Sequence, residues 1–226
     1  FKNLPKKITC AGRPIGEYDD KIPENLTAEE ILIRSGNIGS VRIAQEVGIE
    51  KMKNFLNKIG VLNKIEFDIE EVGEPIPFRW GKCKLATASF GHGITTTLLQ
   101  LAKGYSVISN GGFDVVPTLI KKDNVENRRN RILNEDVSKK INPILRKIVS
   151  TKEGTANFAN IIGYEVGGKT GTAQKTHNGV YTKNKINTFV GVFPSSKPKY
   201  ILLVLLDDPK PSKDYIYHYK DGSGWK

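Results

Sequence analysis

The sequence is poor in cysteine and histidine. Of its 226 residues, two are cysteine and three are histidine, and no C-x-x-C pair occurs. These counts exclude a disulfide framework and a cysteine zinc site. We expect Cys10 and Cys83 to be small unpaired core residues, with a single bridge in an oxidising compartment as the alternative.

The sequence also lacks a long hydrophobic run. The longest is YILLVLL, residues 200–206, whereas a helix needs about 20 apolar residues to cross a bilayer. This run predicts a strand that is buried on both faces. Because the chain starts at Phe1 and ends abruptly at GSGWK, we expect a fragment cut at both ends, whose lack of an anchor says little about the whole protein.

Acidic residues are outnumbered, since 24 Asp and Glu stand against 35 Lys and Arg and give a formal net charge of +11. A basic surface can attract nucleic acid, anionic lipid or an acidic polymer. Here the basic residues are scattered and are not interleaved with aromatic residues, so a nucleic-acid partner is not expected. A generally lysine-rich surface is the interpretation that we adopt.

Helical spacing of apolar residues dominates the first two-thirds of the chain. The clearest start is Thr27, because TAEE is a capping box in which the Thr27 hydroxyl and the Glu30 carboxylate satisfy exposed amides. The glycines of SGNIGS should end this helix. Further helices are predicted at residues 41–48 and 49–60, after the glycine-interrupted turn that begins at ATASFGHG, and at residues 139–150.

The last third of the chain changes to strand-like sequence. Three segments rich in β-branched and aromatic residues predict strands at residues 164–175, 187–196 and 199–209. Their short polar connections, one with a turn signal at Asn178 and Gly179, imply antiparallel neighbours. The predicted fold is α+β and two-lobed, with a mainly helical lobe over residues 1–155 and antiparallel strands over residues 156–226.

Two polar signatures stand out against this layout. SGN, residues 35–37, lies in a glycine-rich break between helices, and KTGT, residues 169–172, lies on the first predicted strand. A site between a sheet and a helical lobe is a usual place for a ligand cleft, so both signatures could converge there. Taken alone, SGN is also compatible with an ordinary turn in which Asn37 caps a helix, and KTGT with a surface hairpin.

With these motifs the sequence resembles the class B penicillin-binding proteins, the peptidoglycan D,D-transpeptidases of bacterial division and elongation. SGN and KTGT match two of the three signatures of penicillin-recognising serine acyltransferases, S-x-N and K-T-G. The segments RSGNIGSVRIAQEVG, ASFGHGITTTLLQLAKGYSVISNGG and FVGVFPSSKPKYILLVLLDDP also fit, as does the terminal GSGW. The resemblance covers nearly the whole chain, is closest to the division type, and implies the serine β-lactamase/transpeptidase-like fold.

The third signature, S-x-x-K, has no counterpart at the expected place. In the family it precedes S-x-N on a buried helix, and here no serine precedes Ser35. The N-terminal stretch FKNLPKKITCAGRPIGEYD resembles the linker that follows that helix. We therefore expect the nucleophilic serine and its lysine upstream of Phe1 and the last helix of the domain after GSGWK, so that the fragment alone is inactive.

The resemblance implies catalytic roles for three residues. Ser35 would relay a proton toward the departing amine. Asn37 would hydrogen-bond the substrate amide and help to orient the missing lysine, which is the base that a weakly nucleophilic serine hydroxyl needs. Lys169 would supply the positive field that favours an anionic substrate carboxylate and lowers the pKa of neighbouring lysines.

The resemblance also implies three substrate-binding residues on the KTGT strand. Thr170 would hydrogen-bond in the cleft, and Gly171 would leave room for the substrate to lie along the strand as an added edge. Thr172 would hold the ligand carboxylate with its hydroxyl, while its backbone amide contributes to the oxyanion hole.

For the other candidate residues, the sequence favours a structural over a functional role. The sequence Gly91-His92-Gly93 suggests a metal ligand, but the three histidines lack carboxylates at ligand spacing, so His92 is expected in a turn or near the cleft floor. Asp207 and Asp208 resemble a carboxylate pair, yet adjacent strand residues face opposite ways, which favours a solvated strand end.

The resemblance implies neither a cofactor nor a metal. Its implied partners are peptidoglycan stem peptides, β-lactam antibiotics, a divisome glycosyltransferase and membrane partners. The implied location is the periplasmic face of the bacterial cytoplasmic (inner) membrane, where an N-terminal anchor would hold the protein. The implied role there is septal wall synthesis. Two alternatives stay open: a β-lactamase or β-lactam-sensing domain of the same superfamily, and a non-catalytic module that binds wall peptide.

Overall fold

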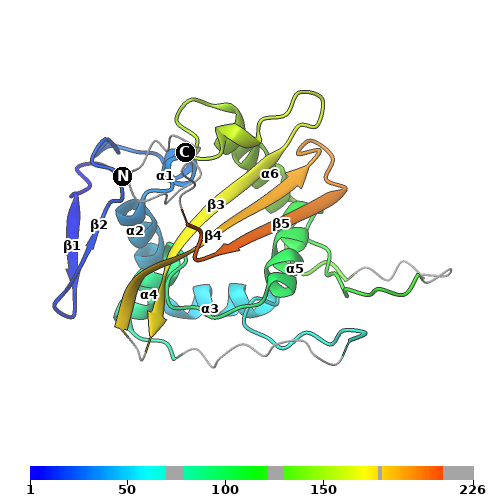
Figure 1. Ribbon diagram of the computed structural model, residues 1–226, viewed down its shortest axis with the longest axis horizontal. Coiled ribbons are helices and arrows are strands. Elements are labelled where there is room, and N and C mark those ends of the chain that lie inside the picture. Colours follow the sequence, from blue (N-terminus) through cyan, green and yellow to red (C-terminus); the bar gives the residue numbers. More distant parts are fainter. Residues whose placement is uncertain (70–78, 122–129, 178–179, 211–226) are drawn as a thin grey trace.

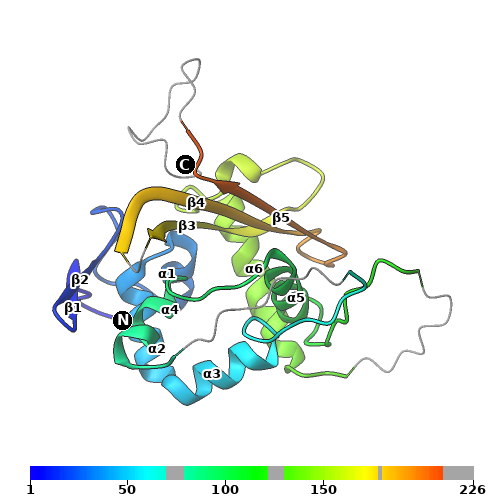
Figure 2. The ribbon, with the colours of Figure 1, turned by 60° about the horizontal axis from the view of Figure 1, so that its bottom comes forward.

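A sheet and a set of helices form two layers, which Figure 2 shows one above the other. This computed structural model describes residues 1–69, 79–121, 130–177 and 180–210. The helices are α1 (Ala28–Arg34), α2 (Asn37–Val47), α3 (Ile49–Lys58), α4 (Lys82–Ser89), α5 (Leu98–Ser109) and α6 (Glu135–Ser150), and the 3-10 turn η1 (Asn157–Ala159) follows. The strands are β1 (Lys7–Cys10), β2 (Arg13–Gly16), β3 (Gly167–His177), β4 (Val180–Phe193) and β5 (Tyr200–Asp207).

Local sequence signals set the starts of two helices. The predicted capping box is confirmed, because the Glu30 amide donates to the Thr27 hydroxyl at 3.2 Å and the Thr27 amide donates to the Glu30 carboxylate at 2.8 Å. Thr97 and Gln100 form a second box at the start of α5. Two predictions were wrong: α2 already begins at Asn37, inside the expected break, and α4 begins before the glycine turn, where no helix was expected.

The predicted antiparallel arrangement of the last three strands is confirmed. β3, β4 and β5 are consecutive antiparallel neighbours, with Lys169 opposite Val190 and Val190 opposite Leu203. β4 is longer than expected, because it begins at Val180, within the predicted polar connection. β3 is shifted toward the C-terminus, since it begins at Gly167 and ends at His177. The turn signal at residues 178 and 179, and the terminal GSGW, lie outside the described residues.

The prediction that YILLVLL is buried on both faces was wrong. The first half of β5 alternates, with Tyr200 61% and Leu202 50% exposed while Ile201 packs against the core, and its last three residues are all exposed. The physical reason is that α5 and α6 pack on one side of the sheet and, within the described residues, β5 is an edge strand (Figure 1). Within the same residues, no helix combines the length and the hydropathy that crossing a bilayer requires.

The prediction that the cysteines are unpaired was also wrong. Cys10 and Cys83 form a disulfide that joins the β1–β2 hairpin to α4, with the two Cα atoms 5.7 Å apart. A two-stranded hairpin is marginally stable by itself. The bridge and the burial of Ile15 therefore fix the hairpin against the helical layer, beside α2 (Figure 1).

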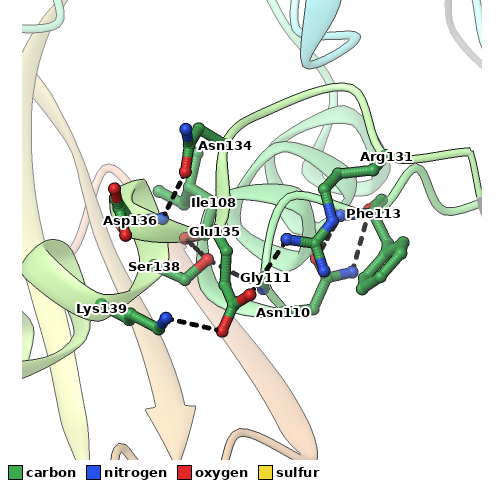
Figure 3. A network of polar contacts seen from close by, with 10 residues as sticks. All are labelled: Ile108, Asn110, Gly111, Phe113, Arg131, Asn134, Glu135, Asp136, Ser138 and Lys139. Carbon is green, nitrogen blue, oxygen red and sulfur yellow. Dashed lines mark hydrogen bonds and ion pairs between the residues drawn. The ribbon is translucent and has the colours of Figure 1, made fainter.

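A polar network fixes the start of α6 against the end of α5, as Figure 3 shows. The Ser138 hydroxyl donates to the Ile108 carbonyl at 2.7 Å and accepts from the Gly111 amide at 2.8 Å. On the exposed side, Glu135 forms ion pairs with Arg131 and Lys139, which lower the pKa of the Glu135 carboxyl. These contacts place α6 beneath β3, where Leu145 and Ile148 join the core.

Candidate active site

The two signatures predicted from sequence meet in the structure. The Lys169 ammonium on β3 donates to the Ser35 hydroxyl at the end of α1 at 2.7 Å, although the residues are 134 positions apart. It also donates to the Thr170 carbonyl at 2.8 Å, which holds the side chain along its own strand. Lys169 and Ser35 therefore form one polar centre between the helical layer and the edge of the sheet.

Ser35 occupies an unusual backbone conformation. It is the C-cap of α1 and has a φ of 57°, in the left-handed region that favours glycine. The Gly36 amide bonds to the Ile31 carbonyl at 2.9 Å, and the Ser35 amide bonds to the Leu32 carbonyl at 3.2 Å. This tight ending turns the chain sharply between α1 and α2 and directs the Ser35 hydroxyl toward β3.

Asn37 is the first residue of α2, and its side-chain and backbone amides are fixed by the last residue of β2 and the residue after it. Its Nδ2 donates to the Gly16 carbonyl at 2.9 Å. Its backbone amide donates to Glu17 Oε2 at 2.7 Å, and the Ile38 amide donates to Glu17 Oε1 at 3.0 Å. The Glu17 carboxylate therefore acts as the N-cap that Gly36 cannot supply, and among the described residues the side-chain oxygen and the second N–H of Asn37 make no hydrogen bond.

We call Gly16–Tyr18 the clamp, because each of its residues holds the S-x-N region. In addition to the bonds of Gly16 and Glu17, the Tyr18 hydroxyl donates to the Arg34 carbonyl at 2.6 Å. Sequence reasoning missed the clamp. Its residues lie about 20 positions from the groups that they hold, and no periodicity links a hairpin end to a distant helix start.

The remaining KTGT residues lie along β3, which within the described residues is an edge of the sheet. Thr170 lies opposite Phe189, Gly171 opposite Thr188 and Thr172 opposite Asn187. A Cβ added at Gly171 would lie 2.5 Å from the Thr188 hydroxyl oxygen, so the Thr188 side chain on the neighbouring strand crowds this position. The Thr172 side chain is exposed, and the free edge of β3 can pair with an extended ligand.

A second residue that sequence reasoning missed is Thr155. It lies in the turn after α6 and is 5% exposed, and its hydroxyl is 2.7 Å from the Thr170 hydroxyl. Nothing in the sequence EGTANF distinguishes this threonine from one in an ordinary turn.

The other candidate residues lie apart from this centre. His92 is in the turn after α4, between Phe90 and Tyr181, and burial lowers the pKa of its imidazole. Asp207 forms an ion pair with Lys175 at 2.7 Å, and Asp208 pairs with Lys210. In the part of the chain that the structure describes, no group of three His, Cys, Asp or Glu side chains could hold a metal ion.

Two tetrapeptides have the S-x-x-K spacing but not the expected setting. SGWK, residues 223–226, lies outside the described residues. SKPK, residues 196–199, forms the turn between β4 and β5, where the Ser196 hydroxyl contacts the Glu165 carboxylate. Neither tetrapeptide precedes S-x-N, and Ser196 lies in a turn rather than on a buried helix.

Comparison with known proteins identifies the family. The family model for the penicillin binding protein transpeptidase domain matches residues 3–222. A probable peptidoglycan D,D-transpeptidase PenA of Neisseria flavescens is 31% identical over 95% of this chain and 53% of its own length. Stage V sporulation protein D of Bacillus subtilis is 33% identical over 80% of this chain and 30% of its own length. The chain thus spans about half or less of these relatives.

Solved structures agree with the sequence relatives. The transpeptidase domain of penicillin-binding protein 3 from Burkholderia pseudomallei superposes with a TM-score of 0.84 at 27% identity, over 92% of this chain and 63% of that one. Penicillin-binding protein 3 from Mycobacterium tuberculosis, complexed with ampicillin, gives 0.80 at 25% identity, over 92% and 50%. The predicted fold class is thereby confirmed, and this chain belongs to the penicillin-binding protein transpeptidase domain family.

Proposed function

We propose that this chain is the C-terminal part of the transpeptidase domain of a peptidoglycan D,D-transpeptidase of the cell-division type. The observation that carries the proposal is the 2.7 Å contact between the Lys169 ammonium and the Ser35 hydroxyl, in a chain of this family. The nucleophilic serine and its lysine base would be supplied by an S-x-x-K segment upstream of Phe1. The proposed domain comprises a mainly helical part, residues 1–155, and a strand part, residues 156–226.

The proposed reaction is acyl transfer in two steps. The upstream serine oxygen attacks the carbonyl carbon of the terminal peptide bond of a stem peptide, its lysine takes the serine proton, and Ser35 passes a proton to the departing amine. The amine of a second stem peptide then attacks the ester carbonyl, which forms the cross-link and returns the serine. A penicillin would follow the first step only, so the enzyme would stay acylated.

The polar centre of Lys169 and Ser35, with the S-x-N region held by the clamp, is suited to orient an anionic acyl donor. Lys169 places a positive charge 2.7 Å from the Ser35 hydroxyl and favours a ligand carboxylate. The proposed role of Asn37 is to bond the substrate amide with its remaining amide groups. The proposed role of the exposed Thr172 is to hold the ligand carboxylate with its hydroxyl, while its backbone amide contributes to the oxyanion hole. Donors that are already positioned lower the energy of a developing oxyanion without reorganisation during the reaction.

The partners and the location follow from this proposal. Peptidoglycan stem peptides and β-lactams are the proposed ligands, and a relative of similar fold has been solved in complex with ampicillin. A divisome glycosyltransferase and membrane partners are the proposed neighbours. Because the wall is assembled outside the cytoplasmic membrane, the proposed location is its periplasmic face, with an anchor in an N-terminal segment beyond this chain.

Labelling of the full-length protein with a fluorescent penicillin tests the function. We expect wild-type labelling at a serine upstream of Phe1 and strong loss with Ser35→Ala and with Lys169→Ala. Unchanged labelling in both variants would contradict the role assignments, and no labelling of the wild type would contradict the function itself. Rapid release of hydrolysed penicillin would instead indicate a β-lactamase, since a transpeptidase stays blocked.

A further inference from the structure

The turn after α6 is held rigidly next to the KTGT strand (Figure 1). The Ala156 amide bonds to the Ile148 carbonyl at 3.2 Å, and Asn157 Nδ2 donates to the Val149 carbonyl at 3.1 Å. Gly154 approaches the helix end so closely that an added Cβ would lie 2.0 Å from the Ile148 oxygen. The Thr155 side chain therefore has a fixed position, with its hydroxyl against that of Thr170.

The hydrogen atoms of this hydroxyl pair can be assigned from burial. Thr155 is 5% exposed, and within the described residues its hydroxyl has Thr170 as its partner. A buried hydroxyl that donates to nothing leaves its proton unsatisfied, which is costly. Thr155 therefore donates its proton to the Thr170 oxygen, and the half-buried Thr170 keeps its own proton for another acceptor.

We infer that Thr155 is a positioning residue that makes Thr170 a hydrogen-bond donor to the carboxylate of the bound ligand. This inference rests on the proposed function, because it takes the surface beside Lys169 as the acyl-donor site. A carboxylate can only accept hydrogen bonds. If Thr170 instead donated toward Thr155, its lone pairs would face the ligand anion, so the direction of one buried hydrogen bond decides between attraction and repulsion.

The position of Thr170 next to Lys169 gives this bond its importance. The Lys169 ammonium bonds to the Thr170 carbonyl and to Ser35, so the threonine and the polar centre share one short stretch of β3. A hydrogen bond from a neutral donor to a charged group is stronger than one between neutral groups. Thr155 would thus act on the ligand through Thr170 without touching it.

The test compares Thr155→Val, which has nearly the same shape but no hydroxyl, with Thr155→Ser, which keeps it. The measurement is the second-order rate of acylation of the full-length protein by a penicillin and by its carboxylate methyl ester. We expect Thr155→Val to slow penicillin by about tenfold, the usual size of one hydrogen bond to a charged group. Thr155→Ser should stay within about twofold of wild type, since the donor is retained.

The ester separates this role from a merely structural one. Because the ester carries no charge at that position, we expect Thr155→Val to slow its reaction much less than that of the free acid. Thr170→Val should slow penicillin as Thr155→Val does, and the double variant should be no slower than Thr170→Val alone. Should Thr155→Val fail to fold, Thr155→Cys, with its weaker S–H donor, replaces it.

Three results would overturn the inference. These are equal penicillin rates for Thr155→Val and wild type, equal slowing of the acid and the ester, or effects of Thr155→Val and Thr170→Val that multiply. A wild-type protein that no penicillin acylates would contradict the proposed function instead, so the two failures are distinguishable.

Discussion

Replacement of Glu17 tests whether the clamp holds the S-x-N region. Both carboxylate oxygens accept backbone amides, from Asn37 at 2.7 Å and from Ile38 at 3.0 Å. Ile38 is fully buried, so water cannot replace the lost acceptor at its amide. Loss of an N-cap and of the partner of a buried amide together should cost about 2 kcal/mol in Glu17→Ala.

Glu17→Gln separates charge from hydrogen bonding. It keeps one acceptor oxygen but loses the negative charge that the start of α2 favours, so we expect a cost of about 1 kcal/mol. In a domain of this size, each kcal/mol shifts the midpoint of thermal unfolding by about 2–4 °C. The unfolding midpoint should therefore fall by about 4–8 °C in Glu17→Ala and by half as much in Glu17→Gln.

Two measurements on the full-length protein check this expectation. Calorimetry gives the shift in midpoint, and hydrogen exchange resolved to residues 36–40 shows whether the Ile38 amide loses protection. Penicillin acylation should also slow, because Asn37 loses its fixed orientation. Glu24→Gln is the matched control, since Glu24 is an exposed glutamate of the same N-terminal segment. Unchanged exchange at Ile38 in Glu17→Ala would refute the reasoning.

Three further perturbations have expected outcomes. Replacing Cys10 and Cys83 by serine should lower the free energy of unfolding in urea by about 4 kcal/mol, since the bridge closes a loop of 73 residues; a change below about 1 kcal/mol would contradict this. Burial raises the pKa of Tyr105 to about 12. The free energy of unfolding should therefore fall by up to about 3 kcal/mol as the pH rises from about 10 to 12. Tyr105→Phe should abolish that fall. Gly171→Ala should destabilise the sheet, and adding Thr188→Ala should restore stability in thermal unfolding if the Thr188 hydroxyl is the obstacle; no restoration would exclude that cause.

The direction in which Tyr105 changes stability with pH follows from the number of protons that each state binds. Between the unfolded pKa near 10 and the folded value of about 12, the folded state binds more protons than the unfolded state. Stability must therefore decrease with rising pH in this window, and it is fully present below it. Tyr105→Phe removes the ionisable group while keeping the ring in the core.

The predictions from sequence succeeded where the cause is local. The capping box at Thr27 needs only residues three positions apart, and the strand segments were found from β-branched runs joined by short connections. The start of α2 was missed because its cap comes from Glu17, in another part of the chain. The Cys10–Cys83 bridge was missed for the same reason, since only the folded hairpin brings the two cysteines together.

The site was predicted through motifs rather than through patterns of hydrophobicity. SGN and KTGT indicated Ser35 and Lys169, which the fold brings into contact. The sequence could not indicate Glu17 or Thr155, because both act on a motif residue from a separate element and neither has a characteristic spacing to it. Supporting residues of this kind become visible only when the hydrogen-bond partners of each motif residue are known.

The conformation of Ser35 explains why so much support surrounds it. A non-glycine residue in the left-handed region costs on the order of 1 kcal/mol, and glycine would relieve it. Glycine, however, has no hydroxyl to meet Lys169. The chain keeps a serine at a position suited to glycine, and the clamp holds the residues on both sides of it, through Arg34 and Asn37. A local preference is thus overridden at the point where the proposed chemistry needs a side chain, which is where such conflicts are expected.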